Sequence, residues 1–425
     1  MKIHGDGRRT ILKVIEAIIF KGTSQKNKKK TISYIIERSI QVRNMGFNKK
    51  SITSILLIIL TVVSAFALYT YGNGGLNQIM IILHFGILVM LAFLNDILSD
   101  KFVLGTLFVN LASIVITMMY HSSFGVSIVF LNMLLACFVF NNIRVEKNMY
   151  LFIHLVPAIL WTVIVIFSIK GDYPISTGEI FDYSFFGVIY QKNTVGIVAL
   201  GCIYSWLAVL ETFNIRRLTK NIISVPIIVL FLLKIIESNC RSATFATILF
   251  CVLYYFIRNE IPYKYYYIIM LVGIVLTGLF TIYYVENVVE IDLGDVMGRN
   301  TFHRLGTWEA AFSLIRRYPV FGSGTDIKML IYDSAHNTVL SILKTIGIIP
   351  TVTYAVCFVK RLQNKKQLRY ERVCQMAIIS ALMVSVFESF YVESYFYLTF
   401  LMLLINPTII HNEEKTQEIQ TKASP

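Results

Sequence analysis

Residues 299–347 read RNTFHRLGTWEAAFSLIRRYPVFGSGTDIKMLIYDSAHNTVLSILKTIG. This stretch is the most polar part of a very apolar chain, and long apolar runs flank it on both sides. Hydrocarbon cannot satisfy backbone and side-chain polar groups, so a polar stretch between two membrane spans must lie outside the hydrocarbon or line a wet cavity. The stretch is therefore the first place to look for chemistry, and the apolar remainder is expected to be its scaffold.

The composition excludes an ordinary soluble domain. The 425 residues are 56% hydrophobic and only 15% charged, and the mean hydropathy is +0.65, which indicates a polytopic membrane protein. The net charge of +14 is not spread as a nucleic-acid-binding face would be, because thirteen of the 39 Lys and Arg residues precede residue 51. Such clustering is typical of a segment that sets membrane orientation. We therefore expect a bilayer and no nucleic acid as the partner of these charges.

The six cysteines lie in or beside apolar runs, and no CxxC or Cys/His spacing is present that would hold a metal. They are Cys137, Cys202, Cys240, Cys251, Cys357 and Cys374. We therefore expect neither a disulfide framework nor a zinc site.

Twelve apolar runs are long enough to cross a membrane as helices. They lie near 51–70, 77–94, 102–120, 124–140, 149–169, 194–211, 222–237, 242–257, 265–285, 337–358, 373–388 and 392–408. We therefore expect an all-α polytopic fold, with a transmembrane domain over 51–410. A basic cytoplasmic segment, 1–50, precedes it, a cytoplasmic tail, 411–425, follows it, and a large outer loop, 286–336, contains short interfacial helices.

Lysine and arginine alternate between the connecting loops, as an even number of spans with both ends inside requires. Loops assigned inside carry Lys101, then Arg144 and Lys147, then Arg216, Arg217 and Lys220, then Arg258 and Lys264, then six basic residues from Lys360 to Arg372. The short loops 71–76 and 121–123, assigned outside, carry none. This pattern places the loops 171–193 and 286–336, and the corner between Glu388 and Glu393, on the outer face.

A short helix is predicted within the outer loop. Thr307 can cap it, and Tyr318 and Pro319 end it after Arg317. Its apolar stripe has the spacing of one helical face and consists of Trp308, Ala311, Phe312 and Ile315. Such a helix would lie on the membrane surface. If the helix begins one turn earlier, Arg304 shares a face with Trp308 and lies at headgroup level, where a guanidinium suits a lipid-linked phosphate. The alternative is a surface arginine that snorkels to water.

A turn and a polar helix face follow this helix. Gly322 and Gly324 form a flexible turn, which is only a weak sign of a phosphate loop. His336 then opens the tenth span and heads a polar strip. The strip continues with Asn337, Ser341 and Lys344. Ionisable groups at such a position usually face a bundle interior or a cavity, so His336 is a candidate base, although a lone histidine at a helix mouth can also be structural.

Two further polar clusters lie at predicted outer ends of spans. Lys234, Glu237 and Arg241 are spaced so that all three can share a helical face, with the carboxylate between the cations. They form either a buried ion-pair ladder or an arginine fork that Glu237 orients toward a phosphate. Lys192 and Asn193 open the sixth span from the outer side. The acids Glu388 and Glu393 could also act as bases, or are solvated loop residues.

With these residues assembled, the chain resembles the O-antigen ligase and Wzy-type polysaccharide polymerase family of bacterial envelope glycosyltransferases. The motifs that carry the resemblance follow the family's order. They are QKNTVG at 191–196, SNCRSA at 238–243, HRLGTW at 303–308, YPVFGSG at 318–324 and SAHNTVLSILKTIG at 334–347. The likeness covers nearly the whole chain except its first 50 residues, and it implies a GT-C-like membrane fold. One departure is Cys240, where the family often has a small hydroxyl residue.

The resemblance implies an activity on the outer face of the bacterial plasma membrane. Members move a glycan from a polyprenyl pyrophosphate such as undecaprenyl pyrophosphate to a sugar hydroxyl, without a nucleotide donor, a metal or another cofactor. By this likeness, Arg241 and Arg304 hold the pyrophosphate, His336 serves the acceptor hydroxyl, and Lys192 is a further phosphate contact. Other residues expected to bind substrate are Asn193, Lys234, Glu237, Trp308, Gly322, Gly324, Asn337 and Lys344.

Our leading hypothesis is a polymerase that joins lipid-linked oligosaccharide repeat units into a capsular or O-antigen-like surface polysaccharide. A chain-length regulator and a flippase of the same pathway are its expected protein partners. A ligase that transfers finished glycan to another acceptor is the closest alternative, since it shares the donor chemistry. A flippase or transporter of lipid-linked sugars is the alternative from a different class. A transporter would spread charged residues along several spans, whereas here they concentrate at the outer mouth.

Overall fold

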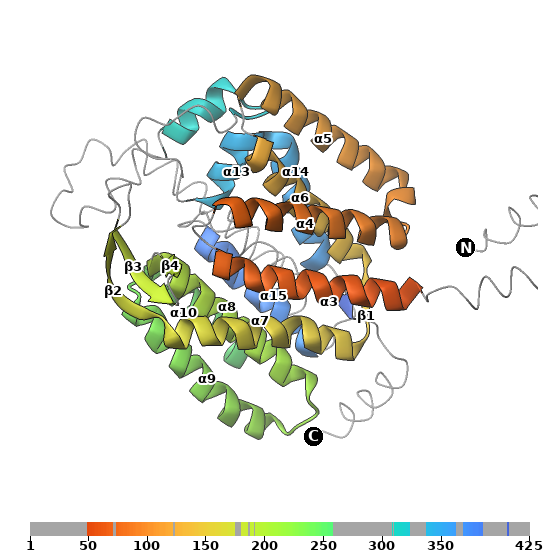
Figure 1. Cartoon of the computed structure of the whole chain (residues 1–425). Coiled ribbons are helices and arrows are strands. Elements are labelled where there is room, and N and C mark those ends of the chain that lie inside the picture. Colours follow the sequence, from red (N-terminus) through yellow and green to blue (C-terminus); the bar gives the residue numbers. More distant parts are fainter. Residues whose placement is uncertain are drawn as a thin grey trace, which may run out of the picture. The chain divides into compact units, whose positions relative to one another are not determined.

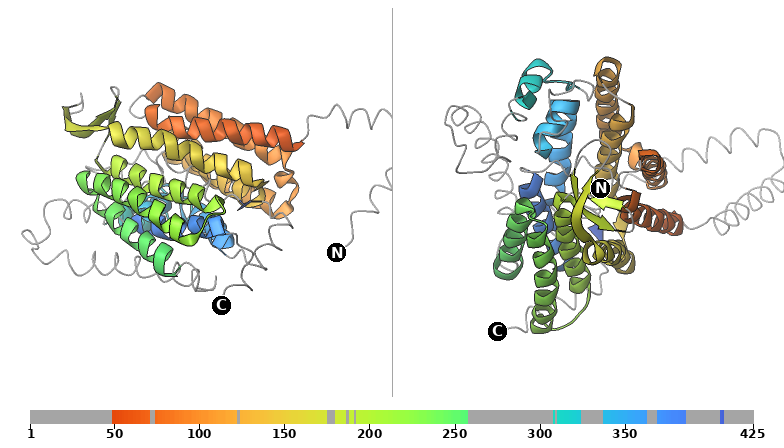
Figure 2. Two further views of the ribbon diagram at one scale, coloured as in Figure 1. Left: turned by 90° about the horizontal axis from the view of Figure 1, so that it is seen from below. Right: turned by 60° about the vertical axis from the view of Figure 1, so that its left-hand side comes forward.

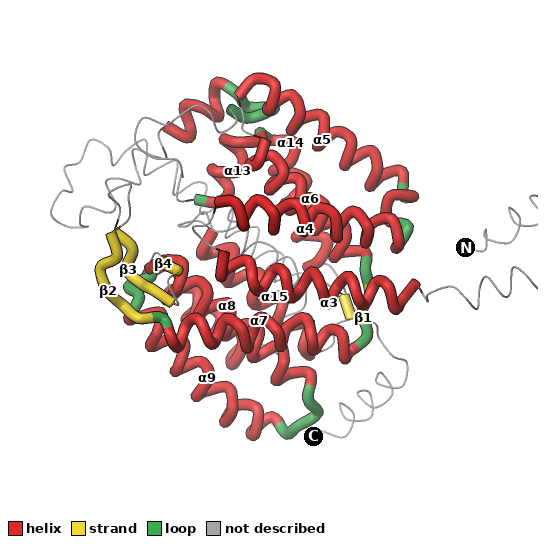
Figure 3. Tube along the Cα trace, viewed as in Figure 1, coloured by secondary structure: helices red, strands yellow, loops and turns green. Residues whose placement is uncertain are grey.

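The structure is a computed structural model that is mostly helical (Figure 3). It describes residues 49–70, 74–121, 124–174, 180–185, 188–190, 192–257, 308, 310–323, 337–362, 369–385 and 406–407. The chain divides into two units, Met1–Ile52 and Thr53–Pro425. Only residues 49–52 of the first unit are described, and the second unit holds the other described residues.

Apolar helices make up most of this unit (Figure 1). The first six are α3 (Lys49–Ala67), α4 (Gly74–Leu94), α5 (Lys101–His121), α6 (Phe124–Asn142), α7 (Lys147–Phe167) and α8 (Lys192–Thr212). The next five are α9 (Arg217–Glu237), α10 (Arg241–Val252), α13 (Thr338–Ile346), α14 (Ile348–Leu362) and α15 (Arg369–Ser385). Short turns η1 (Leu68–Thr70) and η2 (Ile97–Ser99) follow α3 and α4, and a π-helical turn, η3 (Leu253–Ile257), continues α10.

Four described helices, α3, α7, α8 and α9, are each long and apolar enough to cross a bilayer. They match four of the predicted spans, and a membrane location is consistent with them. The helices α4, α5, α6, α10 and α15 also form where apolar runs were predicted. The predicted run 265–285 and most of the run 392–408 lie outside the described residues.

The helices pack in two groups (Figure 2). In the first group α8 lies at the centre and contacts α7, α9, α10 and α15, and in the second α6 contacts α4, α5 and α14. Nearly every side chain of α8 is buried, as expected for a helix that is apolar on all sides. At the edge of the first group α9 exposes a stripe of large apolar side chains. The stripe consists of Ile222, Val225, Val229, Leu233 and Ile236, which suits a surface that faces lipid.

Helices α7, α8 and α9 follow one another in the chain and lie side by side in alternating directions (Figure 1). Strand β1 (Arg144–Val145), between α6 and α7, pairs in parallel with β5 (Asn406–Pro407). These two segments therefore lie at the same end of the unit, which is what an even number of crossings between them predicts. We call the end of the unit where α7 stops and α8 begins the sheet end. The end that carries β1 and β5 is called the opposite end.

The sheet end carries a small antiparallel sheet, so the expectation of an all-α fold was wrong in this loop. Strands β2 (Ile169–Pro174), β3 (Ile180–Phe185) and β4 (Val188–Tyr190) pair in the order β2-β3-β4. Within β3, residues 181–185 (FDYSF) alternate apolar and polar side chains, which is the period of a strand with one face on a core. The buried side chains Tyr183 and Phe185 stand on that inner face.

Two tyrosine hydroxyls make hydrogen bonds near this sheet. The Tyr190 hydroxyl donates to the backbone oxygen of Leu68 at 3.4 Å, and the Tyr69 hydroxyl donates to the backbone oxygen of Leu160 in α7 at 3.2 Å. Burial, and to a lesser degree Tyr69, raises the pKa of Tyr190 above its ordinary value, so its hydroxyl remains a donor. The first bond thus joins β4 to the turn η1 that follows α3, and the second joins η1 to α7.

The predicted span 337–358 is not one helix. It breaks at Gly347, where φ is +79° and α13 gives way to α14. A Cβ atom at this position would lie 2.1 Å from the backbone oxygen of Val320, so only glycine fits. Pro350 falls in the first turn of α14, where its missing N–H leaves no helical hydrogen bond unmade. The predicted span is therefore divided into two helices at Gly347, where the backbone of Val320 lies against it.

Candidate functional site

One group of predicted site residues lies at the sheet end of α8, α9 and α10. Lys192 and Asn193 open α8 directly after strand β4, Lys234 and Glu237 stand in the last turn of α9, and Arg241 opens α10. These positions come from three neighbouring helices that contact one another. The structure thus brings together the motifs QKNTVG and SNCRSA, which are more than forty residues apart in the sequence.

A close approach at Gly196 sets the spacing of this group. A Cβ atom on Gly196 would lie 2.4 Å from the Cβ atom of Cys240 and 2.7 Å from the Oγ atom of Ser238. The turn between α9 and α10 therefore rests directly on the second turn of α8. Asn239 in this turn adopts a φ of +59°, a conformation that asparagine tolerates better than most residues. Cys240 is buried and forms the contact with α8 through its Cβ atom.

Lys234 and Glu237 form an ion pair, with 2.9 Å between Nζ and Oε2, but their side chains are 24% and 39% exposed, so the pair is not buried as the ladder was predicted to be. Lys170 of strand β2 adds a bond from its Nζ atom to the backbone oxygen of Glu237 at 3.2 Å. Both cations stand at the carboxyl end of α9, where positive charge complements the helix dipole. Part of their role is therefore to hold the end of α9 against the sheet.

The prediction that Arg241 shares a helical face with Lys234 and Glu237 was wrong. Helix α9 ends at Glu237, Ser238 and Asn239 form a turn, and Arg241 begins a new helix. Within the described part of the chain Arg241 makes no ion pair, and its side chain is exposed.

The start of α10 adds partial positive charge beside this guanidinium. The side chain of Cys240, at the N-cap position, makes no capping bond, and the first N–H groups of a helix have no partner within the helix. A cation at a helix amino terminus is unfavourable by itself, whereas an anion there is favourable. The surroundings of Arg241 therefore suit an anionic ligand.

A second group of predicted site residues surrounds α13. Trp308 and Ala311 are buried against Leu340, and Phe312 and Ile315 pack around them. The predicted apolar stripe is therefore present, and its helix ends at Arg317 as expected. The stripe packs on protein and is therefore not the face that would contact lipid; that the helix lies on the membrane surface stays a prediction. Leu340 on α13 supplies the apolar partner that the bilayer was expected to supply.

The turn after this helix is docked on the break between α13 and α14. The backbone N–H of Ser323 donates to the backbone oxygen of Lys344 at 2.7 Å, and the Ser323 hydroxyl donates to the same oxygen at 3.1 Å. Gly322 has a φ of +76°, and a Cβ atom on it would lie 2.4 Å from the backbone oxygen of Thr345. Gly322 is therefore required for close packing of the turn. Gly324 lies outside the described residues.

The polar strip of α13 is buried, as the sequence predicted. Asn337, Ser341 and Lys344 are 2%, 6% and 6% exposed. The Oδ1 atom of Asn337 accepts a bond from the backbone N–H of Leu340 at 3.0 Å and thus caps the helix. Part of the polar character at this helix mouth is therefore structural, while Lys344 brings a positive charge to the interior.

Several other candidate residues lie outside the part of the chain that the structure describes. They are Arg304, Thr307, His336, Glu388 and Glu393. In the sequence, Arg304 stands four residues before Trp308, and His336 stands directly before Asn337. Trp308 packs against α13, the helix that Asn337 caps. The described neighbours of Arg304 and His336 therefore belong to one packed block.

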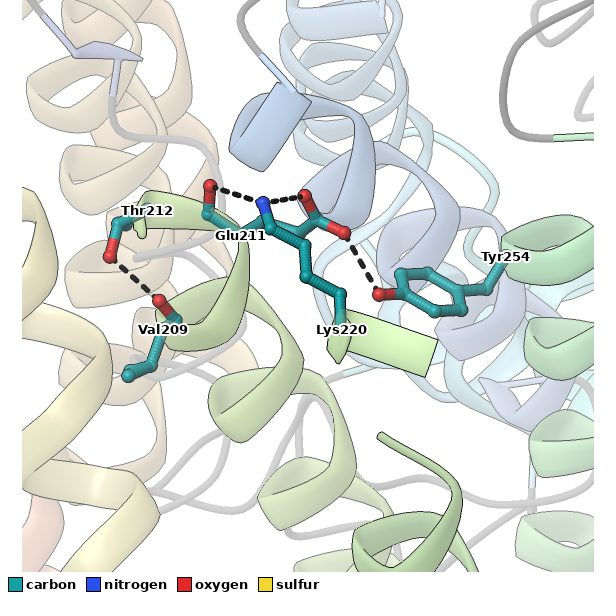
Figure 4. Close-up of polar contacts among 5 residues, drawn as sticks. All are labelled: Val209, Glu211, Thr212, Lys220 and Tyr254. Carbon is teal, nitrogen blue, oxygen red and sulfur yellow. Dashed lines mark hydrogen bonds and ion pairs between the residues drawn. The ribbon is translucent and has the colours of Figure 1, made fainter. Parts of the chain in front are cut away.

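A buried ionic cluster that was not predicted from the sequence lies at the opposite end (Figure 4). The Nζ atom of Lys220 in α9 lies 2.9 Å from the Oε2 atom of Glu211 in α8, and both side chains are nearly inaccessible. The hydroxyl of Tyr254 donates to Oε1 of the same carboxylate at 2.9 Å. Lys220 was predicted to lie in a loop, whereas it stands within α9 and its side chain is buried. An acid at the end of an apolar helix, nine residues before a lysine, was the available signal.

Buried histidines also occur inside the helices. The Nε2 atom of His154 in α7 lies 3.8 Å from the sulfur of Cys374 in α15, and this sulfur lies 2.7 Å from the Tyr150 hydroxyl. The Nε2 atom of His84 in α4 lies 3.1 Å from the Ser64 hydroxyl in α3. These contacts link neighbouring helices. Nowhere in the described ranges do three His, Cys, Asp or Glu side chains gather as a metal site would require.

Comparison of the chain with protein-family models and with curated proteins returned no match. The resemblance to the polysaccharide polymerase and ligase family therefore depends on the five motifs. Two of these motifs meet at the start of α8 and α10, and residues of the other three meet around α13.

Proposed function

We propose that this chain is a metal-independent glycosyltransferase that acts on the outer face of the plasma membrane. It polymerises lipid-linked oligosaccharide repeat units into a surface polysaccharide. The donor is a glycan on a polyprenyl pyrophosphate, and the acceptor is a hydroxyl of a second repeat unit. Its place is the bacterial plasma membrane, with both chain ends on the cytoplasmic side.

The observation that carries this proposal is the pairing of distant motifs. Gly196 of the first motif touches Cys240 of the second. Trp308 of the third packs on Leu340 of the fifth, and Ser323 of the fourth binds the backbone of Lys344. Motifs that serve one site must be close in space although they are far apart in the sequence. Packing of the apolar helices would not by itself require these polar motifs to be in contact at the loops.

Charge supports a phosphate ligand at the sheet end. Lys170, Lys192, Lys234 and Arg241 stand on adjoining elements there, and Glu237 pairs with one of them, Lys234. A pyrophosphate leaving group gains negative charge as the anomeric bond breaks, so fixed cations stabilise the transition state more than the ground state. Arginine remains charged in a poorly hydrated site, and its fork matches two phosphate oxygens. Arg241 and Arg304 have this role in the proposal.

The acceptor hydroxyl needs a base that is neutral near physiological pH. His336 has this role, since a neutral imidazole accepts a proton and typically contributes about 10² to 10⁴ in rate. Cations nearby disfavour a second positive charge and so favour the neutral ring. The polyprenyl tail stays in the bilayer while its head reaches the polar residues.

The test is complementation of a strain that lacks its own copy of the gene. The variants are Arg241→Ala, Arg304→Ala and His336→Ala, and the matched control is Arg217→Ala, an exposed arginine at the opposite end of α9. Loss of long polymer with accumulation of lipid-linked single units is expected from the three site variants and normal polymer from the control. Normal polymer from both Arg304→Ala and His336→Ala would remove the assignment.

The products also separate the alternatives. If the protein is a ligase, loss of its activity would leave long lipid-linked chains that are not attached to their acceptor. If it is a transporter, loss of its activity would leave repeat units on the cytoplasmic side. Elongation of lipid-linked repeats by the purified protein without an ion gradient would exclude a transporter. Elongation by the purified protein alone is the outcome that a polymerase predicts.

A further inference from the structure

The turn that follows the helical residues 310–317 ends in exposed apolar side chains. Val320 is 43% exposed and Phe321 is 38% exposed. Arg316 and Arg317, immediately before the turn, are exposed as well. The Trp308 side of the same helix is buried against α13, so one part of this segment faces protein and its tip faces outward.

The tip is continuous with a surface that must face lipid if α14 crosses the membrane. The backbone N–H of Ile348, the first residue of α14, donates to the backbone oxygen of Pro319 at 3.1 Å. From there Ile348, Val352 and Val356 stand four residues apart, on one face of the helix, and are 50%, 52% and 51% exposed. In a spanning helix, such a stripe contacts hydrocarbon. The turn therefore sits where the lipid-facing stripe begins.

We propose that residues 316–321 form a membrane foot that rests on the leaflet at the sheet end. Val320 and Phe321 enter the boundary between headgroups and acyl chains, and Arg316 and Arg317 bind lipid phosphates. The ligand is an anionic bilayer surface. This inference is independent of the proposed transferase activity, since it concerns the outward tip of the segment and not the motifs that meet around α13.

Other effects account for only part of this arrangement. The two arginines complement the carboxyl end of their helix, and the guanidinium of Arg317 lies 5.5 Å from the centre of the Tyr318 ring. Neither effect concerns Val320 and Phe321, which remain 43% and 38% exposed. A short apolar tip flanked by arginines satisfies both requirements at a headgroup layer, where apolar side chains leave water and cations meet anionic lipid.

The membrane foot also fixes the depth of the helix break. Gly347 directly precedes Ile348 and touches Val320, so the break lies at the membrane surface. The buried charge of Lys344, three residues before the break, then lies near the depth of lipid phosphates and avoids the high cost of a charge in hydrocarbon. If the proposed function holds, this is the depth at which the donor pyrophosphate would be bound.

The test uses the full chain in vesicles of phosphatidylcholine, with and without phosphatidylglycerol. The variant Phe321→Cys carries an environment-sensitive fluorophore, and Asp172→Cys, at an exposed position of strand β2, is the matched control. Labelling of the unsubstituted chain gives the background from its own cysteines, of which five are buried. Lipids with a nitroxide near the headgroup and aqueous iodide serve as the two quenchers.

The label at position 321 is expected to lose most of its emission to the lipid nitroxide and little to iodide, and the label at position 172 the reverse. Iodide quenching at 321 as strong as at 172 would overturn the membrane foot, and so would a label that neither quencher reaches, because protein would then cover it. If Phe321→Cys does not give monodisperse protein, Val320→Cys replaces it. In Arg316→Gln/Arg317→Gln, the increase in lipid quenching caused by phosphatidylglycerol should be lost; if it persists, the arginines do not bind anionic lipid.

Discussion

Ser323 donates twice to the backbone oxygen of Lys344, through its N–H at 2.7 Å and its hydroxyl at 3.1 Å. This oxygen belongs to the last turn of α13, where carbonyl groups have no partner within the helix. The turn at Ser323 thus supplies hydrogen-bond donors to a carbonyl group at the end of α13. The break and the turn therefore stabilise each other, and the last part of the large loop forms one block with α13.

Gly347→Ala tests this interlocking. Its Cβ atom would lie 2.1 Å from the backbone oxygen of Val320, at a φ of +79°, and such a backbone conformation alone costs about 1–3 kcal/mol for a non-glycine residue. We expect a lower midpoint of thermal unfolding in detergent and less monodisperse protein. Gly105→Ala is the matched control, since nothing lies within 4 Å of its added Cβ atom. Equal midpoints for the two variants would contradict the packing.

Asn337 was predicted to bind substrate and is found to cap α13. Asn337→Ala should destabilise the protein by about 1 kcal/mol, which is typical for the loss of such a cap. Asn337→Ser retains a capping oxygen and should restore most of the thermal midpoint. If the serine variant recovers stability but not polymer synthesis, the amide also contacts substrate. If alanine leaves the midpoint unchanged, the cap does not stabilise the helix.

The cluster of Glu211, Lys220 and Tyr254 predicts strong coupling. Glu211→Gln or Lys220→Met leaves one buried charge without its partner and should cost about 3–5 kcal/mol. The double variant removes both charges and should cost much less than the sum of the single variants. Thermal unfolding of all four proteins completes the cycle, and additive costs would show that the pair is not coupled.

The close contact at Cys240 makes a prediction about side-chain size. Cys240→Ser nearly preserves the volume and should retain polymer synthesis, since a hydroxyl can also meet the Ser242 hydroxyl, which lies 3.5 Å from the sulfur. Cys240→Val adds bulk beside Gly196 and Ser238. It should displace the start of α10, and Arg241 with it, and lower the affinity for lipid-linked donor. Overpacking of this kind costs roughly 1–3 kcal/mol, so donor titration at a temperature where both variants are folded is the measurement. Equal donor affinity would show that Arg241 does not depend on this contact.

The apolar runs of the sequence predicted the helices well because length and hydropathy are local properties. Helix α7, for example, was expected over 149–169 and forms over Lys147–Phe167. The three-stranded sheet was missed because the alternation in β3 covers only residues 181–185. The break at Gly347 was missed because its cause is the backbone of Val320, a contact that no local pattern reveals.

The candidate site was predictable to a similar extent. The pair of Lys234 and Glu237 follows from helical spacing within α9, which sequence alone specifies. The direction of Arg241 depends on where α9 ends, and neither proline nor glycine marks that end. The burial of Lys220 depends on Glu211 and Tyr254, which come from two other helices. Burial and side-chain direction were therefore predicted incorrectly for Lys220 and Arg241, whose positions depend on where helices end and on residues of other helices.

The most direct test of the account is a reaction with purified protein in vesicles that contain a lipid-linked oligosaccharide repeat unit and no nucleotide sugar. We predict that the wild-type chain forms longer lipid-linked glycans and releases polyprenyl pyrophosphate, and that His336→Ala forms neither. Elongation by the His336→Ala protein at the wild-type rate, or none by correctly folded wild-type protein, would contradict the account.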